Sequence, residues 1–284
     1  MGSCADRVAF VSGASRGIGR AIARRLAAEG ASVVVSASRL GAHASLAGTL
    51  EDAVAEILAA GGRAAAVAAN LASADERRDL IARAEAPFGP LDLLVNNAAM
   101  ARWSLPSRTP VPDLRKLLEV NLLAPVDLAQ QALPGMRERR RGWILNVTSD
   151  SARQPAVPYR DTPEAAHAIT AYGASKAALD RYTGGLAHEV AGDGVFVNAL
   201  APVAIVLTQE AVRVAGHLAK SHPDLVEPVE VMVEAALELL TGAHVGRVVT
   251  SRALLHERAR SVRSLDGRRL IGDAHMPADL AAVV

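Results

Sequence analysis

The sequence is poor in cysteine and has no long apolar run. Its one cysteine, Cys4, excludes an internal disulfide framework. That fits a reducing compartment, so we expect a cytoplasmic protein in which Cys4 belongs to a flexible N-terminal segment. No stretch reaches the roughly 18 apolar residues that a membrane span needs. The first residues also lack a long apolar run behind a basic start, so we expect neither a membrane segment nor a signal peptide.

The charges are almost balanced, with a net charge of +1 and an isoelectric point near 8.0. A nucleic-acid partner would require a basic excess or stripe, so none is expected. The one dense basic cluster, "RERRRG" at 137–142, follows a helical pattern, and we expect it to stay solvated at the carbonyl end of that helix. The eight histidines show no metal-ligand spacing, and the nearest pair, His217 and His222, is predicted to be on the surface, so no metal is expected.

Lysine is so scarce that one lysine stands out. Only Lys116, Lys176 and Lys220 occur among 31 basic residues. In the segment "AYGASKAAL", Tyr172 precedes Lys176 by four positions, and neither other tyrosine has such a partner. Residues four apart lie on one face of a helix, so both side chains can point into one cleft. The pair alone also fits an ordinary exposed helix surface, and the rest of the chain must decide.

Short apolar runs alternate with amphipathic segments from about residue 6 to 251. The runs predict seven strands, at 8–12, 32–37, 64–69, 91–96, 143–148, 195–200 and 245–250. Helices are predicted between them, for example at 18–30, 50–62 and 74–89, each ending in glycine. This alternation predicts an α/β fold with a doubly wound, mostly parallel seven-stranded sheet and helices on both faces. We expect one domain over 1–284, while the tail 257–284 carries too little periodicity to place.

A glycine-rich loop follows the first predicted strand. "SGASRGIGR" places Gly13, Gly17 and Gly19 where the chain turns into a helix. Glycines permit a tight turn and a close approach of phosphate to the backbone, and the positive end of the helix dipole attracts a pyrophosphate. The loop therefore predicts a dinucleotide site.

The second strand ends without an acidic side chain. NAD enzymes hold the ribose 2′-hydroxyl with a carboxylate about 20 residues after the glycines. This chain instead reads "SASRL" at 36–40, with Arg39 there and Arg16 in the loop. Two guanidinium groups suit a 2′-phosphate, so NADP is preferred over NAD. The alternative is that both arginines are solvated surface residues.

The order of these motifs resembles the short-chain dehydrogenase/reductase family in its single-domain, Rossmann-like form. After the glycine loop come "NL" at 70–71, "NNAA" at 96–99, Asn121 in "EVNLLAP", Ser149 in "NVTS", and the Tyr172–Lys176 pair. The resemblance implies the catalytic residues Asn121, Ser149, Tyr172 and Lys176. It implies that Gly13, Ser15, Arg16, Gly17, Ile18, Gly19, Arg39, Asn70, Leu71, Asn97, Ala98, Tyr172, Lys176 and Pro202 bind the cofactor.

In that family the tyrosine acts as general acid or base for an alcohol or carbonyl. The resemblance implies that Tyr172 has this role and that Ser149 hydrogen-bonds the substrate oxygen. We expect the Lys176 ammonium to lower the pKa of Tyr172 and to hold the ribose, while Asn121 steadies a water that relays protons. The chain is then expected to be an NADP(H)-dependent oxidoreductase.

Four departures from the family pattern concern the site. Asn70 stands where the family usually has aspartate, and Ala99 replaces a glycine. The 23 residues from Ser149 to Tyr172 are a long gap, which suggests an inserted loop. Thr208 falls one position late for its usual contact with the nicotinamide amide, which puts that contact in doubt. We expect 152–170 and 203–227 to form substrate-site loops.

The predicted site loops are rich in apolar residues. "MARW" at 100–103, "QPAVPY" at 154–159 and "VAIVLT" at 203–208 favour a carbonyl or alcohol on an apolar body. Three nearby arginines, Arg102, Arg153 and Arg160, keep a 3-oxoacyl thioester as an alternative substrate. A cofactor-retaining isomerase or dehydratase, or a non-catalytic dinucleotide-binding protein, also fits the fold. By analogy with the family, the helices bearing Asn121 and Tyr172 would form a homodimer or homotetramer.

Overall fold

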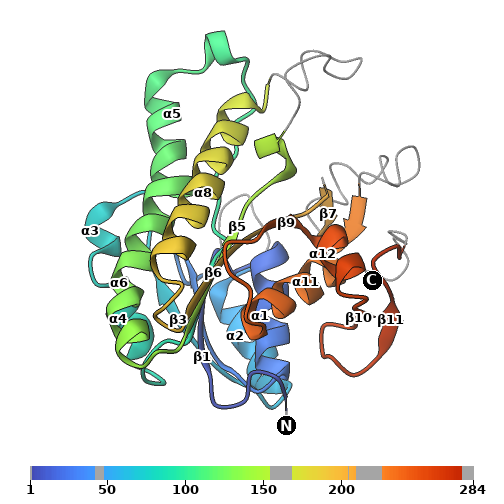
Figure 1. Cartoon of the computed structure of the whole chain (residues 1–284). Coiled ribbons are helices and arrows are strands. Elements are labelled where there is room, and N and C mark those ends of the chain that lie inside the picture. The colour runs from blue at the N-terminus through green and yellow to red at the C-terminus, as the bar shows by residue number, and fades with distance from the viewer. Residues whose placement is uncertain (1, 42–47, 154–167, 204, 209–225, 277–284) are drawn as a thin grey trace.

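The computed structural model describes residues 2–41, 48–153, 168–203, 205–208 and 226–276. Seven parallel strands form its main sheet, in the order β3-β2-β1-β4-β5-β6-β9 (Figure 1). Their bounds are β1 Val8–Ser12, β2 Ser32–Ala37, β3 Arg63–Ala68, β4 Leu93–Asn96, β5 Gly142–Val147, β6 Val195–Ala201 and β9 Val248–Thr250. The predicted seven-stranded α/β sheet is therefore confirmed.

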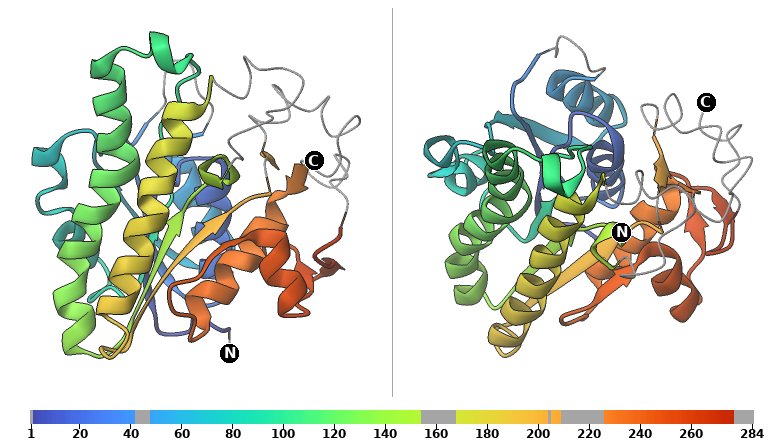
Figure 2. Two further views of the ribbon diagram at one scale, coloured as in Figure 1. Left: turned by 45° about the horizontal axis from the view of Figure 1, so that its top comes forward. Right: turned by 90° about the horizontal axis from the view of Figure 1, so that it is seen from above.

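Helices cover both faces of this sheet (Figures 1 and 2). One face carries α1 Gly17–Ala28, α2 Leu50–Ala59, α11 Val229–Thr241 and α12 Ser251–Glu257, and the other carries α3 Ala74–Arg77, α4 Leu80–Glu85, α5 Val111–Leu118, α6 Ala124–Glu138 and α8 Thr170–Glu189. A hydrophobic core lies on each face of the sheet, and successive residues of a strand pack into opposite cores. In β1, Ala9 and Val11 pack into one core, and Val8 and Phe10 into the other. Burial on both faces explains why the strands read as continuous apolar runs.

The glycines predicted to end helices do so. Gly30, Gly61 and Gly89 follow α1, α2 and α4 with φ angles of +95°, +82° and +91°. Only glycine adopts this left-handed conformation without strain. The third predicted helix, at 74–89, is nevertheless broken into α3 and α4. Its Arg77 side chain is buried and pairs with Glu119 and Asp127, an inward contact that the amphipathic pattern does not reveal.

The prediction of a flexible segment around Cys4 is wrong. The Cys4 side chain is fully buried in the core that contains α1, and its backbone N–H donates to the carbonyl of Glu29 over 3.0 Å. Arg137 lies in the last turn of α6, as expected. It is not only solvated, however, because it also forms ion pairs with Glu189 and Asp193. The basic cluster therefore ties the end of α6 to the end of α8.

Two small sheets were not predicted. Strands β7 Ile205–Leu207 and β8 Val226–Pro228 pair in parallel, and β10 Val262–Arg263 pairs antiparallel with β11 Leu270–Gly272. The second pair lies within the tail that the sequence left unplaced. A buried ion pair joins Glu234 of α11 to Arg25 of α1, and Glu234 also pairs with the partly exposed Arg260, which leads into β10. Within the described part of the chain, no helix is long and apolar enough to cross a membrane.

Candidate functional site

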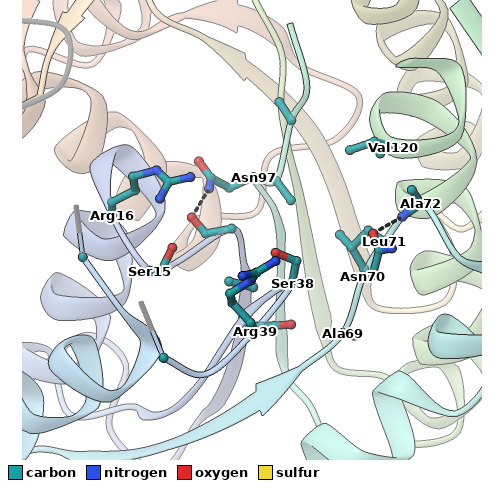
Figure 3. Close-up of a pocket in the computed structure, with 17 residues that line it drawn as sticks. Ser15, Arg16, Ser38, Arg39, Ala69, Asn70, Leu71, Ala72, Asn97 and Val120 are labelled. Atoms are coloured by element: carbon teal, nitrogen blue, oxygen red, sulfur yellow. Dashed lines mark hydrogen bonds between the residues drawn. The ribbon is translucent and has the colours of Figure 1, made fainter. Parts of the chain in front are cut away.

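A pocket of about 350 Å³ opens at the carboxyl ends of the first four strands (Figure 3). The strand order reverses between β1 and β4, and such a switch point is where doubly wound sheets bind ligands. The pocket is lined by Gly13, Ser15, Arg16, Ser36, Ala37, Ser38, Arg39, Gly41, Gly48, Ala69, Asn70, Leu71, Ala72, Asn97, Ala98, Ala99 and Val120. Eight of the residues predicted to bind cofactor are among these.

Asn97 fixes the glycine loop against β4. Its side-chain Nδ2 donates to the carbonyls of Ser12 and Gly13, over 2.9 and 3.1 Å. The Ser12 hydroxyl in turn accepts from the backbone N–H groups of Asn97 and Ala98. These hydrogen bonds connect the glycine loop to the ends of β1 and β4, the two strands that meet at the switch point, and so fix its backbone conformation.

Two glycines are required for this shape. Gly13 has a φ of +65°, and a Cβ placed there would lie 2.7 Å from the Cα of Ala98. A Cβ on Gly19 would lie 2.6 Å from the carbonyl oxygen of Gly13 and would collide with the Asn97 amide. Gly17 also has a positive φ, of +58°. The bare backbone left by these glycines forms a cradle at the start of α1.

The pocket presents polar groups that lack partners. Figure 3 shows Arg16 and Arg39 reaching it from the glycine loop and from the segment after β2. Within the described residues, neither guanidinium pairs with a carboxylate, and the buried Ser36 hydroxyl has no hydrogen-bond partner. A buried polar group without a partner costs free energy that a polar ligand recovers. These groups fit a phosphorylated ribose.

Asn70 lies in the same pocket with its side chain exposed. Its Oδ1 accepts from the N–H of Ala72, and its own N–H donates to Glu76. Among the described residues nothing hydrogen-bonds the amide nitrogen, so a hydrogen-bonding group stands where the family usually has a carboxylate.

Helix α8 carries both residues of the tyrosine–lysine pair. Lys176 is 1% exposed, and its Nζ donates over 2.8 Å to the carbonyl of Val147, the last residue of β5. The Nζ lies 5.8 Å from the centroid of the Tyr172 ring. Burial lowers the pKa of Lys176 to about 8, although the nearby Asp180 carboxylate raises it. The two side chains share one face of α8, as their spacing predicted.

The expected effect of Lys176 on the Tyr172 phenol is not what the structure shows. Burial raises the pKa of Tyr172, and a hydrogen bond from the Ser149 hydroxyl lowers it by less. Desolvation is the larger of these two effects on the phenol. Tyr172 is therefore held as a neutral phenol that can donate a proton.

Ser149 is oriented by its neighbour Ser151. The Ser149 oxygen accepts from the backbone N–H of Ser151 over 3.2 Å and from the Ser151 hydroxyl over 2.9 Å. Ser151 belongs to the short helix η3 Asp150–Arg153, which packs on α8. Because its lone pairs are used in this way, the Ser149 hydrogen points toward Tyr172.

Asn121 lies in a π-helical turn, η2 Glu119–Leu123, between α5 and α6. Pro125 has no N–H to return to the Asn121 carbonyl, and the chain closes an i→i+5 bond from Ala124 to Glu119. The fully buried Asn121 side chain bonds the N–H and C=O of Met100, each over 2.8 Å, and donates to the Ser175 hydroxyl over 3.0 Å. It thus joins the segment after β4 to α8.

The remaining predicted residues lie around the same edge of the sheet. Ile18 packs partly on the core, and Pro202 is buried directly after β6. Thr208 faces the glycine loop, with its Cγ2 3.7 Å from a Cβ built on Gly17. Most of 152–170 and 203–227, including Arg160, His217 and His222, lies outside the described residues. Val206 and Leu207 are buried, so part of the apolar character of 203–208 serves packing.

Three residues that support the predicted catalytic residues were not predicted from the sequence. Ser175 bonds Asn121, Thr148 donates to the Lys176 carbonyl, and Asp180 acts on the Lys176 charge. The signal for Asp180 was its position one helical turn beyond Lys176. In the described part of the chain, no group of three or more histidine, cysteine or acidic side chains could hold a metal.

Comparison with known proteins adds independent information. The family model described as short chain dehydrogenase matches residues 7–215. A short chain dehydrogenase from Pseudocercospora fijiensis is 36% identical over 228 residues, covering 79% of this chain and 68% of the relative. A 3-oxoacyl-(acyl-carrier-protein) reductase from Synechocystis is 37% identical over 202 residues, covering 71% and 75%.

Solved structures that resemble this chain include two with NADP bound. The crystal structure of a 3-oxoacyl-(acyl-carrier-protein) reductase from Agrobacterium tumefaciens with NADP bound has a TM-score of 0.75 and 32% identity, covering 87% of this chain and 93% of that one. A metagenomic short-chain oxidoreductase in complex with NADP has a TM-score of 0.69 and 30% identity, covering 87% and 98%.

Proposed function

We propose a specific reaction for this chain from one premise: it belongs to the short-chain dehydrogenase family. The chain is an oxidoreductase of that family. The proposed reaction interconverts a carbonyl and an alcohol, with NADP(H) as the cofactor and a substrate that has an apolar body. One observation carries the proposal: Tyr172, a half-buried neutral phenol hydrogen-bonded to Ser149, lies one helical turn from Lys176.

The pocket residues fit NADP(H). The glycine cradle at the start of α1 suits the pyrophosphate, while Arg16 and Arg39 suit the 2′-phosphate. The Ser36 hydroxyl supplies a buried polar group without a partner in the described structure. Lys176 would hold the ribose of the nicotinamide half. When bound, the cofactor supplies or accepts the hydride. Two structural relatives that have NADP bound support this choice.

The side chains of the site then move the proton. In the direction of reduction, Tyr172 donates its phenolic proton to the carbonyl oxygen, which becomes an alcohol. Its raised pKa keeps that proton in place at neutral pH. Ser149 donates a hydrogen bond to the same oxygen as negative charge develops there. The Lys176 ammonium stabilises the phenolate that is left, because an opposite charge favours the ionised form.

An apolar substrate body is favoured by an exposed aromatic side chain in the segment after β4 and by the ion pair of Arg102. Trp103, in the segment after β4, is 67% exposed. Arg102 is paired with Asp113 over 2.9 Å, and Arg153 lies 4.0 Å from Asp180. Arg102 is therefore engaged within the chain and is less suited to clamping a charged substrate, whereas the Arg153 contact is long.

A second candidate substrate is a 3-oxoacyl thioester. It is favoured by the names of the Synechocystis and Agrobacterium tumefaciens relatives. The two candidates separate when NADPH oxidation is compared for hydrophobic cyclic and aryl ketones, acyl thioesters and short oxo acids. A marked preference for short, charged oxo acids would contradict the apolar body.

The variant Tyr172→Phe tests the reaction itself. Loss of the acid/base hydroxyl is expected to lower turnover at least about a hundredfold, while the retained ring leaves NADPH binding nearly intact. Tyr182→Phe is the matched control, because Tyr182 is half-buried on the same helix and should retain activity. If Tyr172→Phe kept more than about a tenth of the wild-type rate, Tyr172 would not be the acid/base.

The remaining parts of the proposal concern assembly. The whole chain is proposed to act as one catalytic domain and to form a homodimer or homotetramer through the helices that bear Asn121 and Tyr172. Exposed apolar residues there, Val111 at 58% and Leu123 at 47%, support such an interface. A cytoplasmic location is proposed from the single cysteine. Light scattering on the purified protein measures the oligomeric state.

A further inference from the structure

Helix α8 carries a third titratable side chain in line with the tyrosine and lysine. Asp180 follows Lys176 by four residues, as Lys176 follows Tyr172, so all three lie along one side of the helix. The proposed proton transfer uses Tyr172 and Lys176 and leaves Asp180 without a role. Its side chain is only 13% exposed, which is unusual for a carboxylate that serves no purpose.

The surroundings of the Asp180 carboxyl do not fully satisfy it. Its Oδ1 is buried and has no hydrogen-bond partner within the described residues. Burial raises the pKa of the Asp180 carboxyl, while the charges of Arg153 and Lys176 lower it and favour its ionised form. Arg153, in η3, forms an ion pair with it, but its Nε is 4.0 Å from Oδ2 and its side chain is 37% exposed. An ion pair with this separation and a partly exposed partner neutralises the negative charge of Asp180 only in part.

That field acts on Lys176. Of the described charged groups on α8 and on the elements packed against it, Arg153 and Lys176 are the two that stabilise the Asp180 carboxylate. In the other direction, Asp180 is the one charged group of the described chain that opposes the effect of burial on the Lys176 ammonium. A buried ammonium that donates to the Val147 carbonyl, a neutral acceptor, would otherwise lose its proton readily.

We propose that Asp180 is a positioning residue that keeps Lys176 protonated, and that Arg153 weakens this effect by engaging the same carboxylate. This inference rests on the proposed function, because the charge of Lys176 matters only if Lys176 serves Tyr172 and the cofactor. It also links the site to the segment 152–170, since Arg153 ends η3 at the start of that segment.

The scarcity of lysine makes the charge of Lys176 directly measurable. Protein labelled with ¹³C at lysine Cε gives three resonances, from Lys116, Lys176 and Lys220. The Lys176 resonance is the one that disappears in Lys176→Arg. Its chemical shift is followed against pH in the protein without cofactor, so the readout is independent of enzymatic activity.

The wild-type resonance is expected to titrate with a midpoint near pH 8. Asp180→Asn removes the carboxylate's charge and should lower this midpoint by about half a unit or more. Asp180→Glu keeps the charge and should stay close to wild type, whereas Arg153→Gln should raise the midpoint. Asp193→Asn is the control, because Asp193 pairs with Arg137 beyond the end of α8.

An unchanged midpoint in Asp180→Asn would overturn the inference. If that variant does not fold, an unchanged midpoint in Arg153→Gln overturns it instead. In the activity assay, the fall of kcat/KM at alkaline pH should begin at lower pH in Asp180→Asn, with kcat near pH 6 little changed. The proposed function fails separately: a fully active Tyr172→Phe would refute it, whatever the lysine titration shows.

Discussion

The Nζ of Lys176 is directed at the backbone carbonyl of Val147, 2.8 Å away, and not at the Tyr172 hydroxyl. This bond fastens α8 to the end of β5, directly before the segment that carries Ser149. The lysine therefore fixes the relative positions of the two groups that face the substrate. It does so at a cost, because an ammonium group is buried against a neutral hydrogen-bond acceptor.

The buried lysine should make stability depend on pH. Burial places the pKa of Lys176 at about 8 in the folded protein, below its ordinary value. The unfolded chain therefore binds more protons from about pH 8 to 10, and stability rises as pH rises through that window. For this one group we expect a gain of about 2 kcal/mol between about pH 7.5 and 9.5. Urea denaturation at both pH values measures it.

Lys176→Met is the reference for this measurement, since other groups also titrate at alkaline pH. The variant removes the ammonium and should lose the gain that Lys176 provides. The quantity of interest is the difference between the two proteins in how unfolding free energy changes with pH. Parallel changes in both would contradict the lowered pKa.

The two pocket arginines predict a preference for NADPH over NADH. A charge-paired phosphate oxygen contributes about 1.5 to 3 kcal/mol, so NADPH should bind at least about tenfold more tightly. Arg39→Asp should narrow or reverse that ratio by removing one cation and adding a repulsive charge. Titration of cofactor fluorescence measures both affinities. Arg247→Gln serves as a control, because Arg247 pairs with Glu257 away from the pocket, and equal wild-type affinities would refute the prediction.

Gly19 and Gly184 form a matched pair for testing the glycine loop. A methyl group on Gly19 would collide with the Asn97 amide and the Gly13 carbonyl, so Gly19→Ala should cost about 1 to 3 kcal/mol and weaken cofactor binding. Gly184 lies inside α8, where an added methyl group would meet open space, so Gly184→Ala should stabilise by up to about 1 kcal/mol. Thermal unfolding with and without NADPH compares them, and equal effects would argue against the cradle.

Substitutions of Ser149 and of its neighbour Ser151 distinguish a role in the reaction from a structural role. Ser149→Ala removes the donor to the developing oxyanion and should lower kcat by about 10² to 10³. It also removes the hydrogen bond that lowers the pKa of Tyr172, so that pKa should rise further. Ser151→Ala leaves the Ser149 hydroxyl in place and should keep kcat within a few fold. Steady-state kinetics of both variants decide the assignment; similar losses would place Ser149 in a structural role.

Much of the fold could be predicted because its signals are local. Strands buried on both faces must be apolar throughout, which is why the run at 8–12 coincides with β1. Glycine at the end of a helix follows from backbone sterics alone, as at Gly30. The inward turn of Arg77 and the burial of Cys4 were missed, because each depends on partners far away in the sequence, such as Asp127 and Glu29.

For the site, the sequence by itself determined which groups are present and how they are spaced: the glycines before α1, the missing carboxylate after β2, and Tyr172 one helical turn from Lys176. Only the tertiary structure decided their protonation and partners. It directed Lys176 at Val147, joined Asn121 to Met100 and Ser175, and raised the pKa of Tyr172 where a lowered one was expected. The physical reason is that spacing along a helix is set by neighbouring residues, whereas desolvation depends on every segment that packs over the group.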